Sequence, residues 1–222
     1  MKLRENENLL VLGLFLGLVG VISAVTLAWV SQLTAEPIQA AELRRQQQAM
    51  RRILPDFDNN PLAESISFTV PGEPDPVTFY AVRKQGKLVA LAAAAASRRG
   101  YAGRVEMLAG LTCGGQIIKV LITKENETPG LGKTVCVRKF TRTLADLAAP
   151  APAGLPPNKY LDQFSELDIA APHRWHSIKN GGDFEYRTGA TVSSEAVISL
   201  VGVIAQTYCE HRSAILKAFE ER

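Results

Sequence analysis

The longest apolar segment lies near the start of the chain. The run from Leu9 to Val30, "LLVLGLFLGLVGVISAVTLAWV", contains no charged residue. As a helix it is long enough to cross a bilayer core, which needs roughly 20 residues. A signal peptide is the alternative, but its apolar region usually spans about 7–15 residues, and no clear cleavage site follows. The pattern predicts a tail over residues 1–8 and a single transmembrane helix over residues 9–30.

The segment after the span is rich in Ala, Gln, Leu and Arg, which are good helix formers. It predicts a stalk helix over residues 31–55, in which Pro37 either opens a helical segment or kinks a continuing one. Within the span, Gly13, Gly17 and Gly20 fall on one helix face. Small residues let another membrane helix approach closely, although glycine is also common in membrane helices generally.

Beyond residue 55 the apolar residues follow strand patterns. "VTFYAVR" (77–83) and "KLVALAA" flank a turn at Gln85-Gly86, and a short strand "SISFTV" precedes them. The alanines at 92–96 favour helix by propensity, but they continue an apolar strand. "GRVEMLAGLT" and "QIIKVLITK" form a hairpin pattern around the turn "CGG", in which Gly114-Gly115 supplies the turn.

The C-terminal segment, from Val192 on, has the period of a helix. Its apolar positions would face a sheet: Val197, Leu200, Val201, Ile204 and Tyr208. A proline-rich stretch over residues 148–160 is typical of a surface insertion. We therefore expect an α+β fold over residues 56–222, an antiparallel sheet with helices packed on it.

Composition excludes several classes of protein. The net charge is +3 with both signs interspersed, and no basic stripe suggests nucleic acid as a partner. The three cysteines, Cys113, Cys136 and Cys209, form neither a complete disulfide framework nor a zinc knuckle; whether one pair bonds stays open. "HRWH" places His173 and His176 three apart, but no carboxylate or cysteine is patterned with them, so no metal site is expected. We find no catalytic triad or phosphate-binding loop.

The segment "TGAT", residues 188–191, stands directly before the C-terminal helix. Thr191 at a helix start is an ordinary cap for a free N–H. The same position suits a phosphate, because the free N–H groups and the helix dipole favour negative charge. The small residues Gly189 and Ala190 would let a bulky phosphorylated group lie against the backbone. The pattern alone leaves both interpretations open.

A second segment, "ETPGLG" (127–132), forms a tight glycine-proline loop. Glu127 and Thr128 supply polar groups, and Leu131 supplies an apolar face. Such a loop can lie along a flat ring, or it can simply connect a strand to a helix.

Together these segments resemble a known family. The span, "GYAGRVEMLAGLTCGGQIIKVLITKENETPGLG" and "IKNGGDFEYRTGATVSSEAV" are similar to the G subunit of the Rnf electron-transport complex. The same FMN-binding domain occurs in the C subunit of the Na⁺-pumping NADH:quinone reductase. TGAT preceded by KxGGDF and paired with ETPGLG is the specific part of the match.

The resemblance implies a cofactor and a site. The threonine that closes the motif, Thr191, would carry FMN through a phosphoester bond. A separate flavin transferase would attach the FMN, using FAD as donor and a divalent metal. Residues of the two motifs would surround the cofactor, with Lys179 approaching the ring or the phosphate: Thr188, Gly189, Ala190, Glu127, Thr128, Gly130 and Leu131. The sequence departs from the transferase's pattern at Glu185, where aspartate is usual.

The resemblance also implies a function. The chain would be a redox subunit, without catalytic activity of its own, in an ion-translocating ferredoxin:NAD⁺ oxidoreductase. It would lie in the bacterial inner membrane beside the other membrane subunits, with its folded domain on the periplasmic side. The basic residues flanking the span do not choose a side, since Lys2 and Arg4 are balanced by Arg44 and Arg45. The alternatives are the equivalent FMN protein of the quinone reductase and a non-redox membrane-tethered scaffold.

Overall fold

The computed structural model describes residues 2–73, 75–140 and 154–220. Its first element is a continuous helix, α1 (Lys2–Ile53), which passes through Pro37 and ends two residues before Pro55. The segment beginning at Leu9 is long and apolar enough to cross a membrane, and none of its most apolar window is buried. The chain divides into two compact units, residues 1–45 and 46–222. The boundaries expected at residues 8, 30 and 55 stay predictions.

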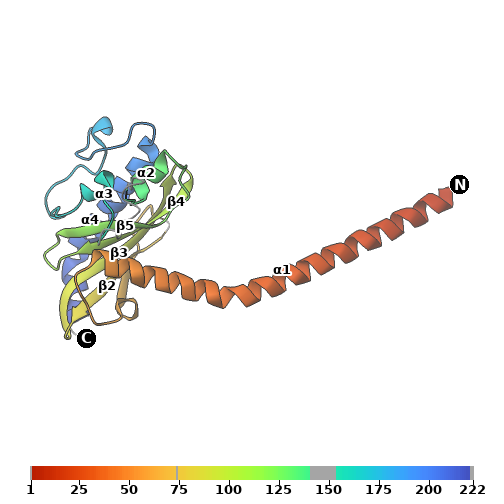
Figure 1. The fold of residues 1–222 in the computed structure, drawn as a ribbon, viewed down its shortest axis with the longest axis horizontal. Coiled ribbons are helices and arrows are strands. Elements are labelled where there is room, and N and C mark those ends of the chain that lie inside the picture. Colours follow the sequence, from red (N-terminus) through yellow and green to blue (C-terminus); the bar gives the residue numbers. More distant parts are fainter. Residues whose placement is uncertain (1, 74, 141–153, 221–222) are drawn as a thin grey trace, which may run out of the picture. The chain divides into compact units, whose positions relative to one another are not determined.

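The second unit is built on a five-stranded antiparallel sheet with the strands in sequence order (Figure 1). The strands are β1 (Ser65–Phe68), β2 (Val77–Lys84), β3 (Lys87–Gly100), β4 (Gly103–Leu111) and β5 (Ile117–Lys124). Gln85 and Gly86 both have positive φ in the β2–β3 turn, as a two-residue hairpin requires. Gly115 has φ +96° in the β4–β5 turn. Both expected hairpins are confirmed.

The alanine run belongs to a strand. Ala92, Ala93 and Ala94 pair with β2 on one side and with β4 on the other. Pairing on both sides satisfies the backbone, and burial on both faces suits small side chains, so tertiary context overrides the helical propensity of alanine.

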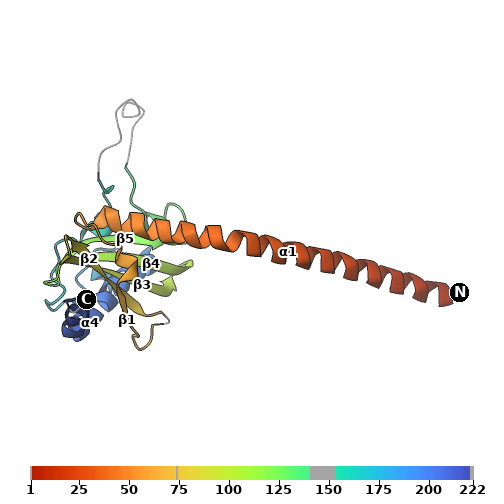
Figure 2. The same cartoon turned by 90° about the horizontal axis from the view of Figure 1, so that it is seen from below.

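One face of the sheet is covered by the C-terminal helix α4 (Thr191–Glu220), which lies mainly across β3 (Figure 2). The five positions expected to face the sheet are each 1% exposed: Val197, Leu200, Val201, Ile204 and Tyr208. They pack against sheet residues such as Phe79, Leu91 and Met107 in the main hydrophobic core. Although α4 is long and apolar enough to span a membrane, it is mostly buried in this core.

The opposite face of the sheet carries a second, smaller core. Ala49, Met50 and Ile53, from the last turns of α1, pack with Phe57 and with Val82, Ala90, Ala92 and Leu108 of the sheet. The end of α1 is therefore part of the folded unit rather than only a tether.

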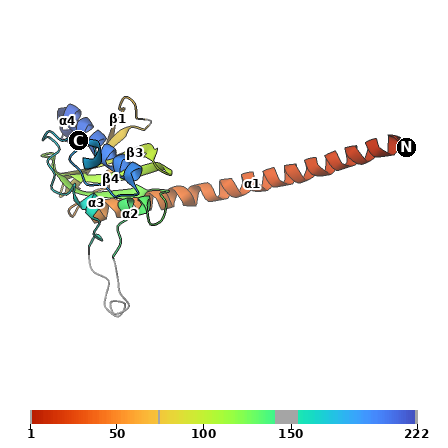
Figure 3. The same cartoon turned by 90° about the horizontal axis from the view of Figure 1, so that it is seen from above.

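Short helices complete the fold. The 3₁₀ helix η1 (Pro61–Ala63) precedes β1, and α2 (Gly132–Cys136) and α3 (Lys159–Asp162) lie near each other beside β5 (Figure 3). A second 3₁₀ helix, η3 (Ile178–Asn180), follows the "HRWH" segment. The proline-rich insertion expected over 148–160 lies outside the described residues up to residue 153. The arrangement confirms the α+β fold with an antiparallel sheet.

Candidate functional site

The first turn of α4 is the centre of the candidate site. Gly189 has φ +84°, a conformation that glycine adopts without strain. The turn is closed by a hydrogen bond from the Ala190 amide to the Arg187 carbonyl, 3.0 Å long. This geometry brings the chain into the helix at Thr191, with Ala190 buried and Thr188 and Gly189 outside the core.

Thr191 does not act as the cap of α4. Its hydroxyl makes no hydrogen bond to any residue that the structure describes, and the capping interactions come from Ser194 instead. The Ser194 hydroxyl donates to the Ala190 carbonyl at 2.9 Å and accepts from the Arg187 amide at 3.1 Å. Within the described part of the chain, the amides of residues 191–193 also find no acceptor. A hydroxyl and three free amides at a helix start fit a phosphate group.

The ETPGLG loop reaches this turn through the buried carboxylate of Glu127, which is 3% exposed. Ser193 donates to its Oε2 at 2.8 Å, and the Ala102 amide donates to its Oε1 at 3.4 Å. Gly132 must lack a side chain, since a Cβ there would collide with Glu127 Oε2 and with the Ser193 hydroxyl. Glu127 therefore joins the loop, the β3–β4 turn and α4, rather than standing free at the edge of a ring.

Two further contacts bring the loop against TGAT. Arg187 Nη2 donates to the Gly130 carbonyl at 3.2 Å. A Cβ built on Gly189 would lie 3.5 Å from Leu131 Cδ2, so the Leu131 side chain lies over this glycine. The structure thus brings together the two motifs, which are about 60 residues apart in the sequence. Leu131 is 46% exposed and leaves an apolar surface near the start of α4.

A second carboxylate, Glu195, holds η3 against the first turn of α4. Its Oε1 accepts from the Ser177 amide and from Asn180 Nδ2, both at 2.9 Å, and its Oε2 lies 3.3 Å from His176 Nδ1. Burial by itself raises the pKa of Glu195, but the hydrogen bonds from Ser177 and His176 outweigh it, and the pKa lies below its ordinary value. Glu195 is therefore a carboxylate with its oxygens already engaged.

Lys179 lies on η3, which Glu195 ties to α4. Its side chain is exposed and makes no hydrogen bond or ion pair with the described residues. Thr128 is also exposed, and its carbonyl accepts from the Leu131 and Lys133 amides within the loop. The structure gives these two side chains no contact with Thr191, so their roles stay predictions. Glu185, at the departure from the transferase's pattern, pairs with Lys159 on the surface.

Sequence reasoning missed three residues of this site: Ser193, Glu195 and Arg187. Ser193 and Ser194 were visible as hydroxyls, but only tertiary contacts show that one binds Glu127 and the other caps the helix. Glu195 stands four residues after Thr191, on the same helix face, which is a signal available from spacing. It also supplies a carboxylate partner for His176, whereas we had expected none from the sequence.

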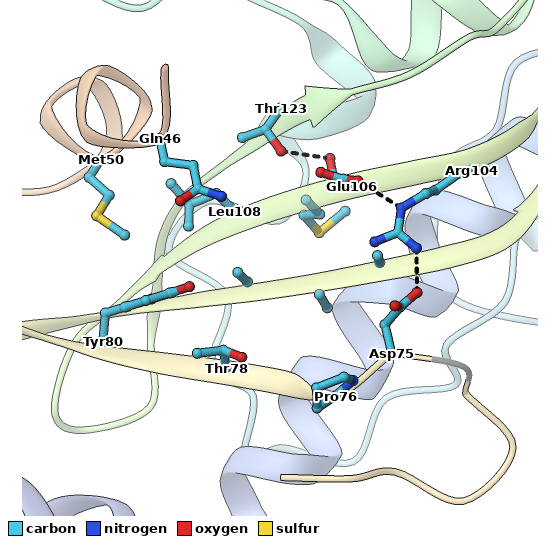
Figure 4. A pocket seen from close by; sticks show the side chains of 14 residues that line it. Gln46, Met50, Asp75, Pro76, Thr78, Tyr80, Arg104, Glu106, Leu108 and Thr123 are labelled. Atoms are coloured by element: carbon cyan, nitrogen blue, oxygen red, sulfur yellow. Dashed lines mark hydrogen bonds and ion pairs between the residues drawn. The ribbon is translucent and has the colours of Figure 1, made fainter. Parts of the chain in front are cut away.

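A cavity of about 220 Å³ lies elsewhere, on the face of the sheet that the end of α1 covers. Figure 4 shows Arg104 at one end of it, with Nε donating to Glu106 at 2.7 Å and Nη1 to Asp75 at 2.5 Å. None of the predicted cofactor residues lines this cavity. The described residues contain no cluster of His, Cys, Asp and Glu that could hold a metal. The three cysteines are free, and burial raises the pKa of Cys136 to about 12, so this thiol is not a nucleophile.

The fold and the site define a flavin-binding class of domain. Residues 100–205, which include the β3–β4 turn, both motifs and half of α4, match the family model described as an FMN-binding domain. The folded unit therefore contains an FMN-binding domain.

The curated relatives extend this similarity to almost the whole chain. All are G subunits of an ion-translocating oxidoreductase complex by name. The chain is 27% identical over 221 residues to the protein of Shewanella piezotolerans, covering 96% of this chain and 95% of the relative. It is 27% identical over 228 residues to that of Pseudomonas aeruginosa, covering 97% and 96%. It is 25% identical over 209 residues to that of Vibrio cholerae, covering 91% of each. The resemblance to the G subunits of Rnf-type complexes is confirmed.

Proposed function

We propose that this protein is a membrane-anchored redox subunit of an Rnf-type ion-translocating ferredoxin:NAD⁺ oxidoreductase. It carries electrons on FMN attached through a phosphoester to Thr191. The observation that carries the proposal is the free Thr191 hydroxyl at the start of α4, whose neighbouring residues contact the ETPGLG loop. The similarity to the G subunits and the matched FMN-binding domain support it.

The residues present fit FMN. The free amides of residues 191–193 would hold the phosphate, and the exposed face of Leu131, with Thr128 and Gly130, would lie against the ring. Glu127 acts by holding the loop in place. Lys179 extends from η3, where a cation would complement the phosphate or an electron-rich ring. FMN supplies the electron-transfer chemistry, and a covalent link keeps it from diffusing away.

Attachment of the flavin needs help from outside the chain. An alkyl hydroxyl is a poor nucleophile and requires a base or a metal. The two carboxylates that contact the first turns of α4, Glu195 and Glu127, already accept hydrogen bonds from neighbouring groups. We therefore propose that a separate flavin transferase, with FAD as donor and a divalent metal, attaches FMN to Thr191.

We place the protein in the bacterial inner membrane as a single-pass component of the complex. The apolar part of α1 forms the span, and the folded unit lies on the periplasmic side. The other membrane subunits of the complex are its partners, and the face of the span formed by Gly13, Gly17 and Gly20 suits close approach of one of their helices.

The attachment is tested by the mass of the intact chain purified from a host with an active transferase. We expect an added mass of FMN less water, located on the peptide containing Thr191. Thr191→Ala should lose all covalent flavin, while Ser199→Ala, a hydroxyl deletion on the same helix, should keep it. Covalent flavin remaining after Thr191→Ala would place the attachment elsewhere. An unmodified wild-type chain would favour the membrane-tethered scaffold instead.

A further inference from the structure

A cleft of about 310 Å³ lies beside the ETPGLG loop. Pro129, Gly130 and Lys133 line it from the loop and α2, and Asn158 and Tyr160 line it from the segment around α3. Neither Thr191, Leu131 nor Lys179 is among its lining residues. The cleft therefore adjoins the candidate flavin site but is separate from it.

The charged side chains that line this cleft are all cations: Lys133, Lys139, Lys159 and Arg187. Two of them have carboxylate partners outside the lining, at 3.3 Å for Lys133 with Glu125 and 3.5 Å for Lys159 with Glu185. Lys139 and Arg187 form no ion pair with the described residues. Two of the four charges remain uncompensated, so the cleft has a positive potential that concentrates anions.

Arg187 supplies an independent sign of a ligand. Its Nε is buried and has no hydrogen-bond partner among the described residues. A buried donor without an acceptor is costly, and an anionic oxygen is the partner that a guanidinium binds best. The Nη2 contact to Gly130 fixes the guanidinium in the wall of the cleft.

The wall formed around α3 is held by many hydrogen bonds. Asn158 Nδ2 donates to the carbonyls of Thr134, Val135 and Val137 at 3.0–3.1 Å. Arg138, whose side chain is 3% exposed, donates to Asp162 at 2.6 Å and to the Pro156 carbonyl at 3.1 Å. These bonds hold the cations around one space before any ligand enters.

We propose that this cleft is a phosphate-binding site, taking the phosphate of a small soluble molecule or of a lipid headgroup. Arg187 and Lys139 are the two cations that bind it. The site stands whether or not Thr191 carries flavin. Because Arg187 also contacts Gly130, a bound phosphate would lie next to the flavin-binding loop.

The test uses the full-length chain in nanodiscs of phosphatidylcholine, titrated with inorganic phosphate at constant ionic strength by calorimetry. We expect saturable binding that weakens about tenfold in Arg187→Gln and severalfold in Lys139→Gln. Lys87→Gln, which removes a cation at the start of β3, should bind as the wild type does. Thermal unfolding of each variant shows whether it is folded. Lys139→Gln keeps the test valid if Arg187→Gln disturbs the loop, because Lys139 makes no hydrogen bond or ion pair with the described residues.

Two further arms distinguish the possible sources of the phosphate and the two sites. Nanodiscs containing phosphatidylglycerol should abolish phosphate binding if a lipid headgroup is the ligand, and should leave it unchanged if a soluble phosphate is. The Thr191→Ala chain and the flavin-bearing chain should bind phosphate equally. Absence of saturable binding, or equal weakening by Lys87→Gln, would overturn the proposal. Binding confined to the flavin-free chain would also overturn it, because the cleft would then belong to the flavin itself.

Discussion

At the scale of single residues, the carboxylates near the start of α4 serve structure. Glu127 and Glu195 each accept hydrogen bonds from a segment that must be held against α4, namely the β3–β4 turn and η3. Capping is done by Ser194. Because these neighbours meet the local hydrogen-bonding needs of the helix start, the Thr191 hydroxyl remains available for modification.

We expect Glu195→Gln to destabilise the protein at neutral pH and to change its acid sensitivity. The pKa of Glu195 is depressed below its ordinary value of 4.5 in the folded state. The stability it contributes is thus fully present above about pH 4.5 and is lost as the pH falls through the folded pKa. The difference in unfolding free energy between wild type and variant should shrink over that range. Urea unfolding at a series of pH values measures it.

Glu210→Gln is the matched control, since Glu210 is an exposed residue of α4 that accepts from Gln206. It should change stability little at any pH. Asp183, whose pKa is also depressed by hydrogen bonds from Arg174, is present in both variants and cancels in the comparison. A Glu195→Gln difference that stays constant down to about pH 3 would contradict the assigned role of the ionised carboxylate.

The sequence was most informative where chemistry is carried by short contiguous motifs. TGAT and ETPGLG could be recognised without a structure, and their approach to each other could be expected from the resemblance. Glu195 and Arg187 could not be assigned, because their roles arise from partners 15 and 57 residues away. A charged residue near a motif shows its role only when its partner is known.

At the scale of secondary structure, the close packing of α4 depends on small residues. Gly202 stands against Trp175, which stacks on Phe184 with ring centroids 5.0 Å apart. A Cβ on Gly202 would lie 2.7 Å from Trp175 Cγ and 2.8 Å from its Cβ. The helix therefore contains a glycine for the sake of the segment that leads into η3.

We expect Gly202→Ala to destabilise the protein by about 1–3 kcal/mol, because Trp175 must move. The sign is informative, since alanine in a helix interior otherwise gains roughly 0.5–1 kcal/mol over glycine. Urea unfolding of the full chain measures the change. Ser199→Ala, one turn earlier on α4, should lie within about 0.5 kcal/mol of the wild type. A stabilised Gly202→Ala variant would show that the Trp175 segment moves away easily.

Among the elements, helices and hairpins with strong local signals were predicted well. Turn residues placed the β2–β3 and β4–β5 hairpins, and apolar spacing placed the buried face of α4. The alanine strand was ambiguous because its propensity and its context disagree. α2, α3 and η3 have five residues or fewer. Tertiary partners stabilise them, such as Asn158 for α2, so no periodic pattern announces them.

At the scale of the whole molecule, one continuous helix, α1, belongs to two environments. Its apolar segment is exposed along its length, whereas Met50 and Ile53 are only 1% and 2% exposed. The sequence predicted a stalk leading out of the membrane. It contained no sign that the end of this stalk packs on the sheet, because the second core involves strands about 30–60 residues further along the chain.

This packing predicts where the chain can be cut. A chain of residues 46–222 should fold on its own and unfold cooperatively. A chain of residues 56–222 should lose the burial of Met50 and Ile53, worth about 3–6 kcal/mol in all at roughly 1.5–3 kcal/mol per side chain. Because domains are typically stable by only about 5–15 kcal/mol, the shorter chain should be close to unfolding. Urea unfolding and binding of a hydrophobic dye compare the two.

Met50→Ala in the chain of residues 46–222 separates packing from chain length. It keeps the whole helix end and should still lose about 2–5 kcal/mol, because it leaves a cavity in the core that contains Val82 and Ala92. If both truncated chains unfold at the same urea concentration, the last turns of α1 contribute nothing to the domain and serve only as a tether. If the shorter chain is unstable and Met50→Ala reproduces much of its loss, the helix that leaves the membrane also completes the core of the flavin-binding domain.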